Sequence, residues 1–279
     1  MTILFIVLKL EEIITGIYLM HPSKDLSSLQ EFYGNTFSNH EKITDLSNYE
    51  LIKYLQQQFN HQENSIPFSD KVAGKKAFDL LLSEYTETMK DGIEAKNLQL
   101  VRDGIADQLT VAHFLAFKID GLHNVVSEEP LSKNSTFEEY RAQTEVAFNK
   151  LQASFYGDDA EIANLDLARY IQVVGNVPQN SNIDIDYDLL SVTFSSLTKI
   201  CEDKVVADQT LQAYADKGYD VHIESVPSGF AIFTSSDFEI KVKNSDNTER
   251  TEVVPKGKFL KSIYKLDPFF KPIQCGADW

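Results

Sequence analysis

Four acidic residues stand in two closely spaced pairs along the chain. Glu84 and Glu87 are three residues apart, and Asp103 and Asp107 are four residues apart. Side chains at these spacings share one side of an α-helix, because each residue turns the helix by about 100°. Carboxylate oxygens are the ligands that magnesium and manganese prefer. The four residues are therefore candidate ligands for Mg²⁺, with Mn²⁺ as a second possible ion.

The sequence around the two pairs predicts a helical hairpin. Periodic apolar residues indicate a helix from about Val72 to Lys90, with its frayed end at Gly92. Asn97 occupies the N-cap position of a second long helix, which we expect to end near Gly121. Two long helices joined by a short turn pack antiparallel, so the acidic pairs should face each other.

On the first helix, Glu84 falls inside the apolar stripe. With Glu84 as the zero, Leu80 lies near about −40°, Ala77 near about 20° and Leu81 near about 60°. Glu87 lies at the edge of the same stripe. One acid of this pair is thus expected to be buried and the other to reach solvent.

On the second helix, both aspartates fall on an apolar face. With Asp103 as the zero, Asp107 lies near about 40°, Phe114 near about 20°, Phe117 near about −40° and Val111 near about 80°. Both aspartates therefore share a face with large apolar residues.

Four carboxylates gathered in this way would repel one another. At about 6 Å and an effective dielectric constant of about 20, each pair costs roughly 3 kcal/mol, and the four together cost on the order of 10 kcal/mol. That approaches the whole stability of a typical domain, about 5 to 15 kcal/mol. Bound divalent cations would remove the conflict.

A structural explanation of the same residues stays open at this point. Glu84 and Glu87 would then pair with Lys76, Lys90 or Arg102, while the two aspartates would cap or bridge neighbouring helices. Acidic residues at these spacings are common on solvated helix faces. Spacing alone does not decide between the two explanations.

The segment LLSEYTETMKDGIEAKNLQLVRDGIADQLTVAHFLAFKIDGL, residues 81 to 122, resembles the core helical hairpin of the MazG-like, all-alpha nucleoside triphosphate pyrophosphohydrolases. Glu84 and Glu87 match the first acidic pair of that family, and Asp107 matches the aspartate that ends the second motif. Gly104 stands where the family has a glutamate. Asp103 takes its place, as in phage-type members, which leaves the metal geometry of this chain open.

A second stretch carries the same resemblance. Residues 183 to 233 and the later PKGKFLKSI are similar to the C-terminal part of such relatives. There a segment like SSLTK brings a lysine to the phosphates, which implies Lys199 as a phosphate ligand, and Lys76 is a second candidate substrate-binding residue. The alternative for Lys199 is an ordinary exposed lysine. The resemblance covers about half of the chain and implies that residues 124 to 181 are an insertion.

The resemblance implies a reaction. Family members hydrolyse nucleoside or deoxynucleoside triphosphates to the monophosphate and pyrophosphate, in control of the nucleotide pool. Carried over, Glu84, Glu87, Asp103 and Asp107 hold the metal, and Glu87, at the edge of the stripe, is the candidate catalytic base. A homo-oligomer and a nucleoside triphosphate substrate are implied in the same way.

Composition and short motifs disfavour several other classes of function. The formal net charge of −16 disfavours nucleic acid as a partner, because phosphate backbones would be repelled. The two cysteines and six histidines have no zinc-ligand spacing, and no P-loop or Rossmann glycine motif is present. His113 is expected to be a packed core histidine. The apolar opening residues 1 to 20 are interrupted by charges, so we expect a structural strand or helix, no membrane partner and a cytoplasmic protein.

The predicted fold is mainly α, an all-alpha pyrophosphohydrolase-like core with a helical insertion and a small C-terminal antiparallel β appendage. The expected division is an N-terminal segment of unclear role (1–70), a helical catalytic core (71–218, insertion about 124–181) and a β-rich appendage (219–279). Further helices are expected at 48–59, from a Ser135/Glu138 capping box to 155, and at 159–174, 187–201 and 203–217, the last with Gly218 as its C-cap.

A rival hypothesis from another functional class also follows from the sequence. The strong negative charge and the glycine at position 104 fit a non-enzymatic acidic interaction protein, either a degenerate member of this fold or a decoy that mimics nucleic acid. Such a decoy would lose binding gradually as scattered surface acids are neutralised. A metal site would fail when Glu84 or Asp107 alone is replaced by its amide.

Overall fold

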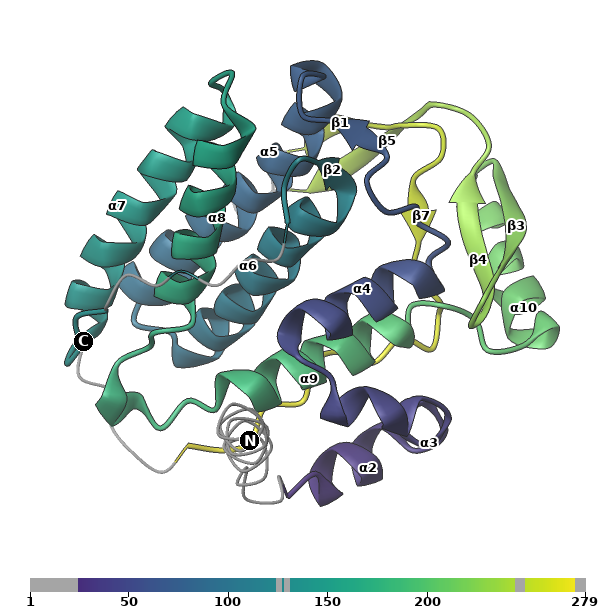
Figure 1. Cartoon of the computed structure of the whole chain (residues 1–279). Helices are drawn as coiled ribbons and strands as arrows, with labels where there is room; N and C mark the ends of the chain where they lie inside the picture. The colour runs from purple at the N-terminus through teal and green to yellow at the C-terminus, as the bar shows by residue number, and fades with distance from the viewer. Residues whose placement is uncertain (1–24, 124–126, 128–130, 244–248, 274–279) are drawn as a thin grey trace, which may run out of the picture.

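The computed structural model describes residues 25–123, 127, 131–243 and 249–273. The expectation for residues 1 to 20 lies outside this range. In the described part the chain is mainly helical, with short antiparallel strands toward the C-terminus, so the predicted fold class is confirmed at this level (Figure 1). No helix in these ranges is long and apolar enough to span a membrane.

Helices α4 to α10 lie close to the predicted positions, whereas α2 and α3 were not predicted. Their bounds are α2 Ser27–Tyr33, α3 Asn35–His40, α4 Asn48–Gln58, α5 Lys71–Glu87, α6 Leu98–Lys118, α7 Phe137–Phe155, α8 Ala160–Val174, α9 Ile185–Leu197 and α10 Lys204–Ala215. Side-chain caps set several of the starts: Asn97, Asp159 and Asp203 each accept from a backbone N–H of the first turn. The capping box before α7 was predicted one residue too early, because Thr136 and Glu139 form the cap, with Ser135 N–H donating to Glu139.

Helices α5 and α6 form the predicted antiparallel hairpin. Between them the chain runs through a π-helical turn, η2 (Thr88–Glu94), rather than a frayed end. The turn packs very closely against α6: a Cβ at Gly104 would lie 2.2 Å from Thr88 Oγ1, and a Cβ at Gly92 would lie 2.9 Å from Val101 Cγ2. Only glycine leaves room for this approach, which fixes how the two helices are set against each other.

Helices α7 and α8 pack on the α5/α6 hairpin to complete a four-helix layer (Figure 1). Aromatic rings join the layer, with Phe78 of α5 stacked on Phe155 at 4.6 Å and Tyr85 stacked on Phe148 at 4.2 Å between ring centroids. Phe148 and Phe155 of α7 lie in the region that the resemblance implies to be an insertion. They share one hydrophobic core with the hairpin.

On the other side of α6 lie α4 and α9, with α2 and α3 packed on α9 (Figure 1). Helix α9 is buried along its whole length from Tyr187 to Leu197. Its central position makes it the element that connects the helical layer with the first helices and with the end of the chain.

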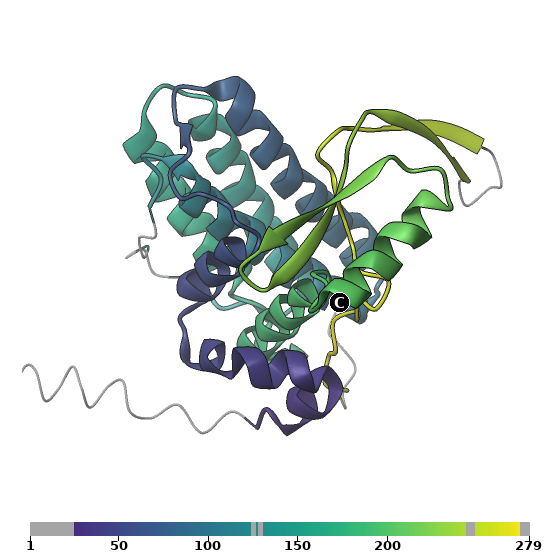
Figure 2. The same ribbon diagram turned by 90° about the vertical axis from the view of Figure 1, so that its right-hand side faces the viewer.

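The strands form three small sheets. The longer strands are β3 Val221–Val226, β4 Gly229–Thr234, β5 Phe238–Lys243 and β6 Glu249–Val254, and the two-residue strands are β1 Ile66–Pro67, β2 Ile119–Asp120 and β7 Phe259–Leu260. The order β3-β4-β7 is antiparallel, β5 pairs with β6 in a separate hairpin, and β1 pairs with β2 in parallel. Figure 2 shows the β5–β6 hairpin extending away from the helices.

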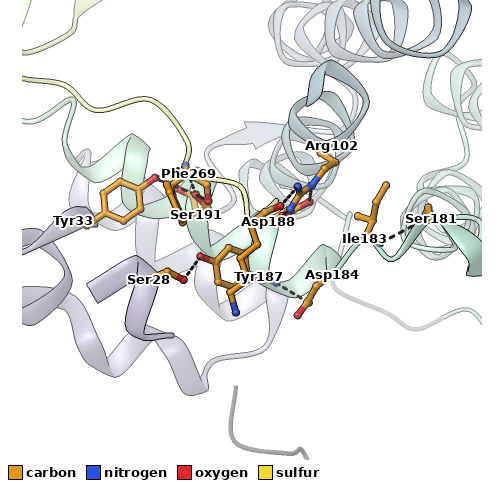
Figure 3. Close-up of polar contacts among 11 residues, drawn as sticks. Ser28, Tyr33, Arg102, Ser181, Ile183, Asp184, Tyr187, Asp188, Ser191 and Phe269 are labelled. Carbon is orange, nitrogen blue, oxygen red and sulfur yellow. Dashed lines mark hydrogen bonds and ion pairs between the residues drawn. The ribbon is translucent and has the colours of Figure 1, made fainter. Parts of the chain in front are cut away.

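After β7, residues 261 to 273 contain no helix or strand and run along α9; we refer to them as the C-terminal strap. Side-chain hydrogen bonds attach it at successive turns. Phe269 N–H donates to Ser191 Oγ at 2.7 Å and to the Tyr33 hydroxyl at 3.1 Å (Figure 3). Leu266 N–H donates to Thr198 Oγ1 at 2.9 Å.

Candidate acidic site

The hairpin brings the four predicted acids into electrostatic contact. Glu84 and Glu87 come from the last turn of α5, and Asp103 and Asp107 come from the first half of α6. The negative charges of Glu87 and Asp103 each raise the pKa of Glu84, and Asp103 and Glu84 each raise the pKa of Asp107. The four acids therefore lie within electrostatic reach of one another, and their assignment as a metal site stays a prediction. Glu84, Asp103 and Asp107 are partly buried, and Glu87 is exposed.

Three of the acids have no partner among the described residues. In the part of the chain that the structure describes, the carboxylates of Glu84, Asp103 and Asp107 accept no hydrogen bond and form no ion pair, whereas Glu87 accepts one from Ser83 Oγ at 3.4 Å. Partly buried carboxylates without a donor are unusual, because desolvation of the charged form is then uncompensated.

The cost of burying these charged carboxylates raises their pKa values. Burial, and then the neighbouring carboxylates, raise the pKa of Glu84 from 4.5 to about 7. The same causes raise the pKa of Asp107 from 3.8 to about 7. Burial also raises the pKa of Asp103, against the nearby positive charge of Lys199. At neutral pH the cluster is thus poised to exchange protons or to accept a cation.

Lys199 is the cation that acts on these acids. It lies in the turn after α9, is partly buried, and its Nζ donates to Ser196 Oγ at 3.1 Å. Burial lowers its pKa, while Asp107 and Asp103 act to raise it. It lies beyond ion-pair distance from them, since no salt bridge joins it to an acid of the described chain. Lys199 is therefore not the ordinary exposed lysine of the alternative explanation.

The ion-pair explanation of the acids is wrong for the described residues. Among the described residues, no salt bridge joins either glutamate to the cations expected to pair with it, which were Lys76, Lys90 and Arg102. Arg102 instead turns away and pairs with the buried Asp188 of α9, through Nε at 2.7 Å and Nη2 at 2.5 Å (Figure 3). The two aspartates of α6 also cap no helix.

A buried hydrogen-bond chain holds the helix that carries Glu84. The Tyr170 hydroxyl donates to Gln108 Oε1 at 2.5 Å, Gln108 Nε2 donates to Thr88 Oγ1 at 2.7 Å, and Thr88 Oγ1 donates to the Glu84 carbonyl at 2.7 Å. The chain links α8, α6 and η2 to the backbone of α5 at Glu84. It fixes the acidic end of α5 against α6.

Lys76 is not at the acidic cluster. It is exposed, and it precedes Glu84 by eight residues, about 12 Å along the helix axis. It lines a hollow of about 570 Å³ with Leu80 and Ala77 of α5 and Phe114 of α6. Leu80, expected in the apolar stripe, is 45% exposed because it faces this hollow rather than the core. The predicted substrate-binding role of Lys76 stays a prediction.

The acids do not form a ready-made metal cage. Among the described residues, no group of three or more histidine, cysteine, aspartate or glutamate side chains is close enough to hold an ion. Their chemistry still fits magnesium, which is commonly bound by one or two carboxylates together with water and substrate phosphate oxygens. The absence of donors on three of the carboxylates points in the same direction.

Sequence reasoning missed residues that the strap brings to the site. The negative charge of Asp267 raises the pKa of Asp103, and the positive charges of Lys261 and Lys265 lower the pKa of Lys199. No periodic pattern marks a segment without helix or strand, so only the basic stretch PKGKFLKSI pointed toward it. His113, by contrast, is 4% exposed, as expected of a core residue, and its Nδ1 has no partner.

Comparisons with known proteins provide no relative for this chain. No protein-family model, no curated protein and no solved structure matches it. The fold and the site define a mainly helical protein with a partly buried acidic cluster at a helical hairpin.

Proposed function

We propose that this protein hydrolyses nucleoside or deoxynucleoside triphosphates to the monophosphate and pyrophosphate in a magnesium-dependent reaction. The observation that carries the proposal is a set of partly buried carboxylates on two packed helices that have no hydrogen-bond or ion-pair partner among the described residues, with Glu84 and Asp107 at pKa values of about 7. The family resemblance of the same hairpin adds the reaction type. Manganese is the second candidate ion, and a homo-oligomer is part of the proposal.

Glu84, Asp103 and Asp107 are the proposed metal ligands, with Glu87 at the edge. A bound divalent ion would neutralise the cluster, join it to the substrate phosphates and polarise the reacting phosphate. The wide spacing of the acids suits this role, because substrate oxygens then complete the ligand set. Each acid is held by a helix rather than a loop, so its position is preorganised.

Glu87 is the proposed general base. It is exposed, unlike the other three acids, so its carboxylate can reach a water that attacks the α-phosphorus. The proton passes from that water to Glu87, the new bond joins the water oxygen to the α-phosphorus, and the bond to the bridging oxygen of pyrophosphate breaks. Lys199, whose charge acts on Asp103 and Asp107, would neutralise the leaving phosphates.

The test is a measurement of pyrophosphate release from a panel of ribonucleoside and deoxynucleoside triphosphates with Mg²⁺ or Mn²⁺. Wild type is compared with Glu84→Gln and Asp107→Asn. Asp79→Asn is a matched control, since Asp79 is an exposed acid of the same helix α5 that pairs with Lys75. We expect metal-dependent release that either site variant reduces by at least about 100-fold, while the control retains activity.

Other outcomes would reject the proposal. No release from any triphosphate, with folded variants and no metal-induced rise in Tm, would favour the acidic interaction protein. Equal loss of activity in Asp79→Asn would show that overall charge, not the cluster, matters.

A further inference from the structure

The hollow beside Lys76 lies between α5 and α6 and is largely apolar; we refer to it as the α5/α6 hollow. Its volume is about 570 Å³, and its lining includes Ala73, Ala77 and Leu80 of α5 and Phe114 of α6. Each alanine carries only a methyl group, so α5 leaves room in front of the Phe114 ring. Leu80 is 45% exposed at the hollow. The hairpin therefore offers an apolar surface that a ligand can reach from solvent.

The α5/α6 hollow lies on the same face of the hairpin as the acidic cluster. On α5, Ala77 and Leu80 point within about 40° of Glu84, and on α6 Phe114 points within about 20° of Asp107. Leu80 precedes Glu84 by about 6 Å along the helix axis, and Phe114 follows Asp107 by about 10 Å. One groove between the two helices thus has carboxylates at one end and an apolar hollow at the other.

An aromatic ring forms the α6 wall of the hollow and is held in position. The His61 ring contacts the Phe114 ring at 6.1 Å between centroids, and a hydrogen bond of 2.6 Å joins His61 Nδ1 and Gln56 Oε1. Phe114 is only partly buried, so its ring remains accessible at the hollow that it lines. Nucleobases stack on such rings, because every base has a flat π surface.

Two charged side chains stand beside this apolar lining. Asp70 and Lys76 both line the hollow, and no salt bridge of the described chain joins them. A carboxylate accepts a hydrogen bond from an amino group, and an ammonium group donates one to a carbonyl oxygen or a ring nitrogen. An apolar hollow with a few polar groups is the usual form of a small-molecule site, and this combination of groups suits a heteroaromatic ring with polar edges.

We propose that the α5/α6 hollow binds the nucleobase of a nucleoside triphosphate whose phosphates extend along the hairpin to the acidic cluster. The choice of this occupant rests on the proposed function, which makes the acids the phosphate end of the site. In a nucleotide the sugar separates the base from the α-phosphate, and the hollow lies about one to two helical turns from the acids. The substrate is therefore a base-bearing triphosphate, and inorganic triphosphate would lack this contact.

The test measures saturation transfer by NMR from the full chain to the base protons of the common ribonucleosides and deoxynucleosides. These probes carry no phosphate, so they report on the hollow without the acidic cluster or a metal. We expect transfer in wild type, none in Ala73→Leu, whose larger side chain fills the hollow, and less in Leu80→Gln. Leu82→Gln is the matched control, because Leu82 is 37% exposed, does not line the hollow and lies about 200° around α5 from Leu80.

Kinetics provides a second measurement with any triphosphate that the protein hydrolyses. Ala73→Leu should raise KM by about tenfold or more with little change in kcat, as expected when one base–aromatic contact is lost from both the ground state and the transition state. Leu82→Gln should keep the wild-type KM.

The outcomes separate this proposal from the proposed function. No transfer from wild type, equal transfer in wild type and Ala73→Leu, or an equal loss in Leu82→Gln would overturn the nucleobase site, even if triphosphates are hydrolysed. Transfer that Ala73→Leu abolishes, without hydrolysis of any triphosphate, would keep the nucleobase site and reject the enzyme. Thermal unfolding checks that each variant is folded.

Discussion

Replacing Asp107 by asparagine should stabilise the metal-free protein, whereas it should abolish the proposed activity. Asp107 has no hydrogen-bond or ion-pair partner among the described residues, and burial and neighbouring acids raise its pKa from 3.8 to about 7. A raised carboxylate pKa means that the folded state binds a proton more tightly than the unfolded state. The ionised side chain therefore opposes folding at neutral and alkaline pH.

The size of the effect follows from that pKa difference. Each pKa unit corresponds to about 1.4 kcal/mol, so ionised Asp107 costs about 4 kcal/mol at pH 8. At pH 5 the folded state already holds the proton, and the remaining cost is about 2 kcal/mol. Burying the amide carries its own cost, about 1 to 3 kcal/mol, which does not depend on pH. The advantage of Asp107→Asn should therefore fall by about 2 to 3 kcal/mol between pH 8 and pH 5.

Urea unfolding at pH 8 and pH 5 in the presence of a chelator measures this difference. Asp79→Asn serves again as the control, because Asp79 is exposed and paired with Lys75. Adding Mg²⁺ at pH 8 should stabilise wild type, by about 2.7 kcal/mol at 100 times Kd, and should stabilise Asp107→Asn much less. A difference between wild type and Asp107→Asn that is the same at both pH values would refute the electrostatic reasoning.

Three further predictions concern stability. Burial lowers the pKa of His113 to about 4, so the folded state holds the neutral imidazole and loses about 3 kcal/mol of stability as pH falls from 6.5 toward 4. Urea unfolding of His113→Phe should lack this part of the loss of stability in acid. Gly104→Ala should cost about 1 to 3 kcal/mol by collision with the facing threonine hydroxyl, whereas Gly175→Ala, with ordinary contacts, should not; Tm distinguishes them. Asp188→Asn should cost about 3 to 5 kcal/mol in urea unfolding by leaving Arg102 buried and unpaired, and hydrogen exchange of residues 262–273 should accelerate.

Local chemistry explains why much of the helical frame could be predicted from the sequence. Asn97, Asp159 and Asp203 are short polar side chains in front of periodic apolar residues. Asn97 caps its helix as expected, and Asp159 and Asp203, which were expected to begin their helices, cap them. The same periodicity placed Glu84 and Asp107 on facing sides of one hairpin. These signals lie within a few residues of the feature that they predict, so no knowledge of the rest of the fold is needed.

The missed features depend on contacts between distant segments. Leu80 has the spacing of a core residue, but the structure leaves it facing a hollow. The pairing of Arg102 with Asp188 joins residues that are 86 positions apart, and sequence spacing favoured nearer partners. The strap has no period at all, so its lysines and Asp267 could not be assigned to the site.

Gly104 stands where the family that the hairpin resembles has a glutamate, and the packing of the hairpin gives a physical reason for the glycine. A side chain there would collide with Thr88, whose hydroxyl is already held by Gln108, so a glutamate at this position is excluded by the close packing of α6 against η2. The nearest position that can carry an acid toward the cluster is Asp103, about 100° around the helix. Among the described residues, no three such acids lie close enough together to hold an ion by themselves. We infer that a metal ion at this site depends on substrate phosphate oxygens to complete its coordination, so ion and triphosphate should bind cooperatively.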